Sequence, residues 1–216
     1  MIRIALRTLS LAAISIAIAA GGANTDARAQ ATPPAGKPAV GAGEIVSFDG
    51  AKMVVKLKDG SNVTLNVPEK AGVSGLRAVP FSELKTTDFI ATAAIKQADG
   101  TLVAREVRIL PDDAKGRISE VHAPYPGEGG SNSTMTNAIV EEIVSTDPKK
   151  RTFKVKGKGG EHTVTIPENV PLTRTVPGSM DLLKPGANIT FFANETDAGL
   201  NAVRFGVGLD GLKPTV

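Results

Sequence analysis

The chain has 216 residues, with 25 Lys and Arg against 22 Asp and Glu, no Cys, no Trp, one Tyr and two His. The absence of cysteine excludes a disulfide framework, cysteine-based zinc sites, a cysteine nucleophile and a lipid-modified N-terminal cysteine. The formal charge is +3, but two of these net charges lie within residues 1–29, which leaves +1 on the rest of the chain. So small a charge gives little long-range attraction to nucleic acid, and we expect no specific nucleic-acid partner.

The first 29 residues are expected to be a cleavable export signal. Arg3 and Arg7 supply a positive start, residues 9–20 are mostly apolar, and residues 27–29 (Ala-Arg-Ala) fit the small-x-small cleavage rule. The apolar run is shorter than the about 20 residues that span a bilayer. We therefore expect a periplasmic protein with no membrane span after signal cleavage, and an uncleaved anchor is the alternative.

Residues 30–42 are expected to be a flexible linker. They contain three Pro and several Ala and Gly, and Val40 is their one large apolar side chain. Such a composition buries too little apolar surface to offset the entropy of ordering the chain.

The strongest signal in the chain is an internal repeat. The motif EIVSFD at residues 44–49 returns as EIVSTD at residues 142–147, and four further blocks return at the same offset of 98–99. One offset kept over five blocks predicts two copies of one domain, spanning residues 43–111 and 138–211.

Each copy is predicted to be β-structure. In copy 1, residues 53–58 and 63–67 alternate apolar and polar side chains except at Val54, which is the period of strands with one buried face. Asp59-Gly60 and Asp99-Gly100 predict two-residue hairpin turns, and residues 80–84 predict one helical turn.

About five strands and a helical turn within each copy indicate a small, partly open barrel of the OB type. The predicted fold class is therefore all-β, with two tandem OB-like β-barrels. The alternative is one sandwich formed by both copies, which would need strands to pair across the repeat boundary. In copy 2, the adjacent Phe191 and Phe192 cannot both face the core, so one of them is expected to face outward and mark a contact surface.

Residues 112–137 join the copies, and residues 212–216 form a tail. At 26 residues, the joining segment is longer than most ordered loops, which rarely exceed about 12–15 residues. We expect this segment either to move or to carry function.

The motifs follow one another in a distinctive order. Thr-x-x-Val-Pro at residues 64–68 precedes Asp-Gly-Thr-Leu-x-Ala at residues 99–104, and residues 133–138 read STMTNA. This order is similar to exported bacterial proteins of unknown function built from OB-like β-barrel repeats, and STMTNA looks like the hallmark of a two-repeat branch. That branch tends to carry a Gly- and His-rich stretch with a Trp in the joining segment, whereas this chain has no Trp. The resemblance implies the fold and the exported location, and it brings no established active site.

Some relatives in that family carry a metal-transporter permease label, which directs attention to metal ligands. His122 and Glu120 in the joining segment are the candidates, because imidazole and carboxylate groups hold zinc or copper. The only other histidine, His162, lies 40 positions further along, so no metal-binding spacing is present. We expect no resident cofactor, and an ordinary surface histidine is the competing interpretation.

A basic strand offers a second candidate site. Alternation predicts that Lys154, Lys156 and Lys158 share one face, opposite Phe153, and Tyr125 could add to a contact surface. OB barrels bind oligonucleotides on such faces with the help of aromatic platforms, but aromatic residues are only 4% of this chain. The alternative is a solvated strand face whose lysines protect an edge against aggregation.

The chain lacks the sequence signatures of enzymes. It has no Gly-x-Ser-x-Gly motif and no phosphate-binding glycine loop. The predicted function is therefore a non-enzymatic, exported binding or interaction module for an unknown protein or small ligand. The alternative is a periplasmic metal- or solute-binding accessory protein of a transport system.

Overall fold

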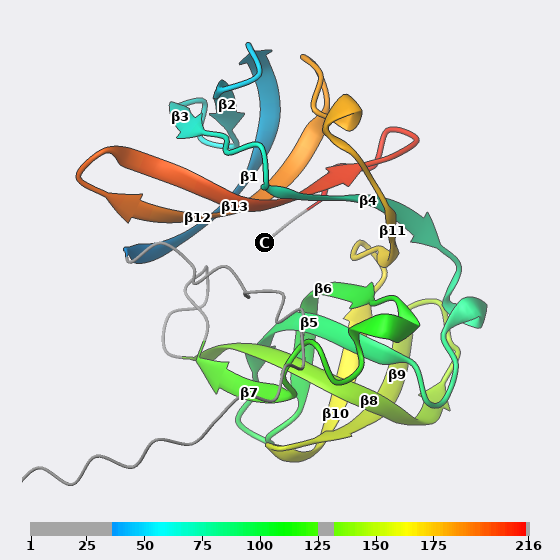
Figure 1. Ribbon diagram of the computed structural model, residues 1–216. Coiled ribbons are helices and arrows are strands. Elements are labelled where there is room, and N and C mark those ends of the chain that lie inside the picture. The colour runs from blue at the N-terminus through cyan, green and yellow to red at the C-terminus, as the bar shows by residue number, and fades with distance from the viewer. Residues whose placement is uncertain (1–35, 125–131, 215–216) are drawn as a thin grey trace, which may run out of the picture. The chain divides into compact units, whose positions relative to one another are not determined.

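The computed structural model describes residues 36–124 and 132–214 of the chain (Figure 1). These residues form strands joined by turns and short 3₁₀ turns, so the predicted all-β class is confirmed. The strands of copy 1 are β1 (Lys37–Phe48), β2 (Lys52–Leu57), β3 (Asn62–Asn66), β4 (Gly72–Val79), β5 (Phe89–Lys96) and β6 (Leu102–Ile109). Those of copy 2 are β8 (Ser133–Ser145), β9 (Lys150–Gly157), β10 (Gly160–Pro167), β11 (Leu172–Pro177), β12 (Asn188–Thr196) and β13 (Gly199–Gly208).

Strands also form in segments expected to be irregular. β1 begins at Lys37, inside the expected linker, because residues 37–44 pair with β12. The joining segment contains η2 (Asp112–Ala114) and β7 (Val121–Pro124), and β8 already begins at Ser133. Composition alone could not show this, because the partner strands that supply the hydrogen bonds lie far away in the sequence.

The expected helical turns are present between the fourth and fifth strands of each copy, as η1 (Phe81–Glu83) and η4 (Met180–Leu182). The hairpins are longer than expected. The amide of Leu57 donates to the carbonyl of Ser61, so the loop around Asp59-Gly60 has more than two residues. Only Gly60 takes a positive φ there, and the Asp59 carboxylate instead accepts the Ser61 amide at 2.9 Å. This is the loop with a left-handed glycine that three-residue hairpins favour.

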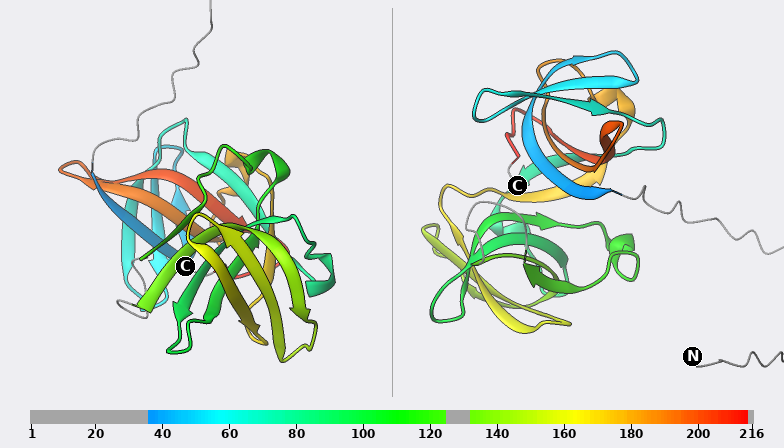
Figure 2. Two further views of the ribbon diagram at one scale, coloured as in Figure 1. Left: turned by 90° about the horizontal axis from the view of Figure 1, so that it is seen from below. Right: turned by 90° about the vertical axis from the view of Figure 1, so that its left-hand side faces the viewer.

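The hydrogen-bonded strand order mirrors itself about the β4–β11 pair. It runs β10-β9-β8-β5-β6-β11 on one side and β4-β13-β12-β1-β2-β3 on the other. The first three strands of each copy therefore pair with the last two strands of the other copy. Figure 1 shows β12 and β13 beside β1, β2 and β3, whereas β5 and β6 lie with β8, β9 and β10. Figure 2 shows the same grouping from two further directions.

The expectation that each copy folds as its own barrel is therefore corrected: the described strands form one 13-stranded sheet in which the copies exchange strands. The strands do pair across the repeat boundary, as the sandwich alternative required. Apart from β4 and β11, each half of this order is a run of five strands, β10-β9-β8-β5-β6 and β13-β12-β1-β2-β3. Two further parallel pairings, β10 with β6 and β13 with β3, join the two ends of each run. Each run of strands is thereby a closed cycle of hydrogen-bonded neighbours.

Two hydrophobic cores lie within the sheet, and each contains side chains of both copies. In one core, Ile45 and Met53 of copy 1 pack with Phe205 of copy 2. In the other, Ile90 of copy 1 packs with Phe153 of copy 2. Because a buried Leu, Ile or Phe side chain contributes about 2–3 kcal/mol by leaving water, neither copy can bury its own apolar surface without the other.

The adjacent phenylalanines behave as expected, since Phe191 is buried in a core and Phe192 is only half-buried. Within residues 36–124 and 132–214, no helix has the length and apolar character needed to cross a membrane. The expected export signal lies outside the described residues.

Strand exchange predicts that a chain cut between residues 127 and 128 stays assembled. We expect fragments 30–127 and 128–216 to copurify after coexpression when only one of them carries an affinity tag, because β1–β3 need β12 and β13 to complete their core. Size-exclusion chromatography with light scattering would measure a one-to-one complex. Either fragment giving a monomer with cooperative thermal unfolding on its own would contradict the exchanged arrangement.

Candidate functional site

The basic strand β9 alternates as expected. Phe153 and Val155 are fully buried in a core, and Lys154 and Lys156 lie on the opposite face. Lys158 does not belong to the strand, because the chain turns after Gly157 towards β10. The alternation therefore correctly predicts that Lys154 and Lys156 share one strand face, whereas Lys158 lies in the turn that follows the strand.

Carboxylates neutralise most of this face. The ammonium of Lys154 lies 2.8 Å from Glu142, its neighbour across the β8–β9 ladder, and 3.9 Å from Glu161. The hydrogen bond to Glu142 is the main cause that raises the pKa of Lys154. Lys156 lies 3.5 Å from Glu141. These pairs are open to solvent, so each contributes little to stability, and they reduce the attraction of this strand for polyanions.

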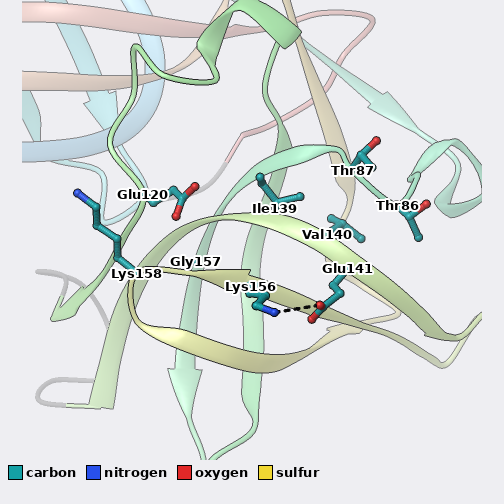
Figure 3. A pocket seen from close by; sticks show the side chains of 9 residues that line it. All are labelled: Thr86, Thr87, Glu120, Ile139, Val140, Glu141, Lys156, Gly157 and Lys158. Carbon is teal, nitrogen blue, oxygen red and sulfur yellow. Dashed lines mark hydrogen bonds and ion pairs between the residues drawn. The ribbon is translucent and has the colours of Figure 1, made fainter.

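A cavity of about 570 Å³ lies beside this face, and we call it the lysine pocket (Figure 3). It brings together three of the predicted residues, Glu120, Lys156 and Lys158, although they come from different segments. Ile139 and Val140 of β8 supply apolar lining, and the ion pair of Lys156 with Glu141 lies at its edge. Lys154 does not line the pocket. The full lining is Thr86, Thr87, Glu120, Ile139, Val140, Glu141, Lys156, Gly157 and Lys158.

One wall of the lysine pocket has an unusual backbone conformation. Thr87 has φ = 78°, a left-handed conformation that β-branched residues rarely adopt. Its amide donates to the carbonyl of Val140 at 2.7 Å, and the amide of Val140 donates to the carbonyl of Asp88 at 2.8 Å. Strained conformations persist only where the surroundings fix them, so these two hydrogen bonds hold the wall against β8.

Gly159 allows the joining segment to lie against the β9–β10 hairpin. β7 pairs with β8, from Val121 opposite Asn137 onward. A Cβ atom on Gly159 would lie 2.3 Å from the Cβ of His122, which is closer than two non-bonded carbon atoms can approach, whereas one on Gly157 would make an ordinary 3.5 Å contact with the carboxylate of Glu120. A side chain at residue 159 would therefore push His122 away from the hairpin.

His122 and His162 stack on one another beside the pocket. Their ring centroids are 4.0 Å apart and the planes differ by 23°. Nδ1 of His122 forms a 2.8 Å hydrogen bond with the hydroxyl of Thr136, and Nε2 of His162 donates to the carbonyl of Gly159 at 3.0 Å. Burial, followed by the charges of His162 and Lys96, lowers the pKa of His122. These effects disfavour the protonated form of His122.

The histidine pair is not a ready metal site. Lone pairs of imidazole lie in the plane of the ring, so two nearly parallel stacked rings do not converge on one ion. Among residues 36–124 and 132–214, no cluster of three or more His, Asp or Glu is placed to hold a metal. Tyr125, the fourth predicted contact residue, lies outside the described residues.

Known protein families, curated proteins and solved structures gave no significant match to this chain. The resemblance to exported OB-like repeat proteins therefore stays a prediction. Sequence reasoning missed Thr86, Thr87 and Ile139, because only the pairing of β5 with β8 brings them to the lysines. It also missed the histidine pair, because nothing in the 40-residue separation indicates that β7 lies against the β9–β10 turn.

Acidification is expected to destabilise the protein through His122. Its folded-state pKa lies below the ordinary value of 6.5, so the unfolded chain binds more protons. The stability that it contributes is complete above about pH 6.5 and is lost as the pH falls through the folded-state pKa. Urea unfolding between pH 7.5 and 5.5 would measure the loss, and the His122→Gln variant should show a flatter pH profile.

The two histidines can also be titrated directly, because they are the only ones in the chain. Nuclear magnetic resonance of the two ring C2 protons should give one pKa below 6.5, which moves up in the His162→Gln variant because the neighbouring ring is gone. Two unshifted titrations would contradict a stacked pair.

Proposed function

We propose that this chain is an exported, non-enzymatic binding module whose contact surface is the lysine pocket. The observation that carries the proposal is the lining of this pocket, with apolar side chains between two lysines and two glutamates. A pocket of several hundred cubic ångströms with apolar lining and a few polar groups is typical of ligand sites. Charges of both signs suit a ligand, or a segment of a partner protein, that carries both signs itself.

We further infer that the two closed cycles of strands are OB-like barrels, each completed by the other copy. In one cycle β3 runs parallel to β13, which pairs with β12, which pairs with β1. In the other cycle β10 runs parallel to β6, which pairs with β5, which pairs with β8. This order and direction support a five-stranded Greek-key barrel of the OB type. Export to the periplasm remains part of the proposal and is supported by the N-terminal signal pattern.

Photocrosslinking in intact cells tests the proposed contact surface. A benzophenone amino acid at position 86, which is exposed and lines the pocket, should form adducts, whereas the same group at the exposed position 70 should not. Intact-mass spectrometry of the purified chain would detect protein and small-molecule adducts alike. The Lys156→Gln/Lys158→Gln variant should reduce the adduct at least fivefold, because the ligand loses its cationic contacts.

The matched control for this experiment is Lys70→Gln/Lys85→Gln, which removes the same charge from exposed sites outside the pocket. Equal adduct yields at positions 86 and 70, or equal effects of the two charge variants, would show that the lysine pocket is not the contact surface.

A second candidate function is a periplasmic metal- or solute-binding accessory protein. The observation that favours it is the approach of two imidazoles, His122 and His162, which could rotate from their stack to bind one ion together with Glu120. Such a change would break the hydrogen bonds of both rings.

Thermal melts with zinc, copper and nickel test this second function. A ligand that binds only the folded state stabilises it by about 2.7 kcal/mol at 100 times its Kd. A metal site should therefore raise the melting temperature of the chain by several degrees, and the His122→Gln/His162→Gln variant should lose the shift. No shift with any of these metals would remove this function.

A further inference from the structure

A second cavity, which we call the arginine cavity, lies where strands of both copies meet. It has a volume of about 350 Å³, and its lining includes Glu106 and Arg108 of β6, Phe192 of β12 and Arg204 of β13. A neighbouring hollow shares Ser74, Arg108, Arg117, Phe192 and Arg204 with it. No residue of the arginine cavity lines the lysine pocket.

Positive charge dominates the arginine cavity. Three guanidinium groups, those of Arg108, Arg117 and Arg204, line it with the carboxylate of Glu106, and Asp113 outside the lining pairs with Arg117. The side chains of Glu106 and Arg108 are only 14% and 16% exposed, and they form an ion pair with one another. Burial of a charged pair is costly unless every polar group is satisfied.

Not every polar group there is satisfied. Nε of Arg108 and the hydroxyl of Thr175 are both buried, and neither has a hydrogen-bond partner among the described residues. Both residues line the arginine cavity, from β6 and from β11. Buried polar groups without partners are rare in native proteins and call for an explanation such as a bound ligand. One donor and one hydroxyl on different strands would both be satisfied by an anion with several oxygen atoms.

An aromatic ring holds one guanidinium in place. Arg204 lies over the ring of Phe192, with 3.9 Å between the guanidinium carbon and the ring centroid, and the two residues are opposite one another in the β12–β13 ladder. Stacking uses the face of the guanidinium and fixes the plane in which its N–H groups point. Phe192 is the outward-facing member of the pair that the sequence marked as a contact surface.

The joining segment supplies the third guanidinium. Arg117 is ion-paired with Asp113 at 2.7 Å and is 67% exposed. The buried Ala114 anchors this segment, and Ile118 and Met135 add apolar lining to the cavity. The cavity therefore combines a buried charged end, a stacked arginine and apolar walls.

We propose that the arginine cavity binds a small organic anion, with a carboxylate or phosphate group between Arg108 and Arg204 and an apolar body against Phe192 and Met135. Guanidinium groups bind both kinds of anion through two parallel hydrogen bonds. The volume fits the lower range of small-molecule sites, and the three guanidinium groups outnumber the carboxylates of Glu106 and Asp113 by one.

Ligand-observed nuclear magnetic resonance on the exported chain, residues 30–216, tests the proposal. The probes are phenyl phosphate and benzoate, with benzyl alcohol as the neutral analogue. We expect at least one anionic probe to bind tenfold more tightly than benzyl alcohol. Failure of both anions to exceed the neutral analogue would overturn the proposal.

Two substitutions with opposite expected effects on the affinity for the anionic probe show where the probe binds. Arg204→Gln should weaken binding of the anionic probe at least tenfold, and Glu106→Gln should strengthen it, because the first removes a contact and the second removes a repulsive charge. Arg204 is exposed, so its variant is expected to fold, and thermal melts check this. Arg77→Gln is the matched control, since Arg77 is exposed and lies outside the cavity.

The two cavities can be distinguished in the same titration. Lys156→Gln/Lys158→Gln should leave binding of the anionic probe unchanged. If this variant abolishes binding while Arg204→Gln behaves like Arg77→Gln, the anion occupies the lysine pocket and the proposed site is wrong. Failure of the lysine pocket to crosslink a partner has no bearing on this result.

Discussion

The antiparallel pairing of β4 with β11 is the constraint on which the rest of the structure depends. Six residue pairs join these strands, from Val79 opposite Leu172 to Ser74 opposite Pro177. β4 pairs with β13 on one side and with β11 on the other, so it connects the half of the sheet that holds β1, β2 and β3 to the half that holds β5 and β6. β5 and β6 then complete the core of copy 2, and β12 and β13 complete that of copy 1. Exchange of identical elements between repeats is a low-cost way to join them, and here it makes the two halves interdependent.

Both candidate sites follow from this exchange. The lysine pocket needs Thr86 and Thr87 of copy 1 against β8 of copy 2, which is a contact that only the β5–β8 pairing provides. The arginine cavity needs β6 of copy 1 and β13 of copy 2 on either side of the central pair. Independent barrels would have left these side chains on separate surfaces. Both proposed binding surfaces thus lie where one copy meets the other.

Local chemistry was predictable from the sequence, and long-range pairing was not. Alternation placed Phe153 inside and Lys154 outside, and adjacency required one of Phe191 and Phe192 to face outward, because both depend only on neighbouring residues. A sequence repeat, however, is equally consistent with strands that pair within a copy and with strands exchanged between copies, since equivalent strands offer the same side chains to either partner. For the same reason the stack of His122 on His162 could not be expected: it depends on where the joining segment lies.

The copies keep one backbone plan and differ at the positions that face the arginine cavity. Ala93 lies opposite Glu106 in the β5–β6 ladder, and the equivalent pair in the β12–β13 ladder is Phe192 opposite Arg204. Positions 106 and 204 are equivalent in the two copies. A glutamate at both of them would have placed like charges in a partly buried space, which raises the free energy of the folded state. Burial raises the pKa of Glu106, and the opposite charges of Arg108 and Arg204 oppose that rise. The divergence of the repeats therefore converts a symmetric junction into a site with one charged end and one aromatic wall.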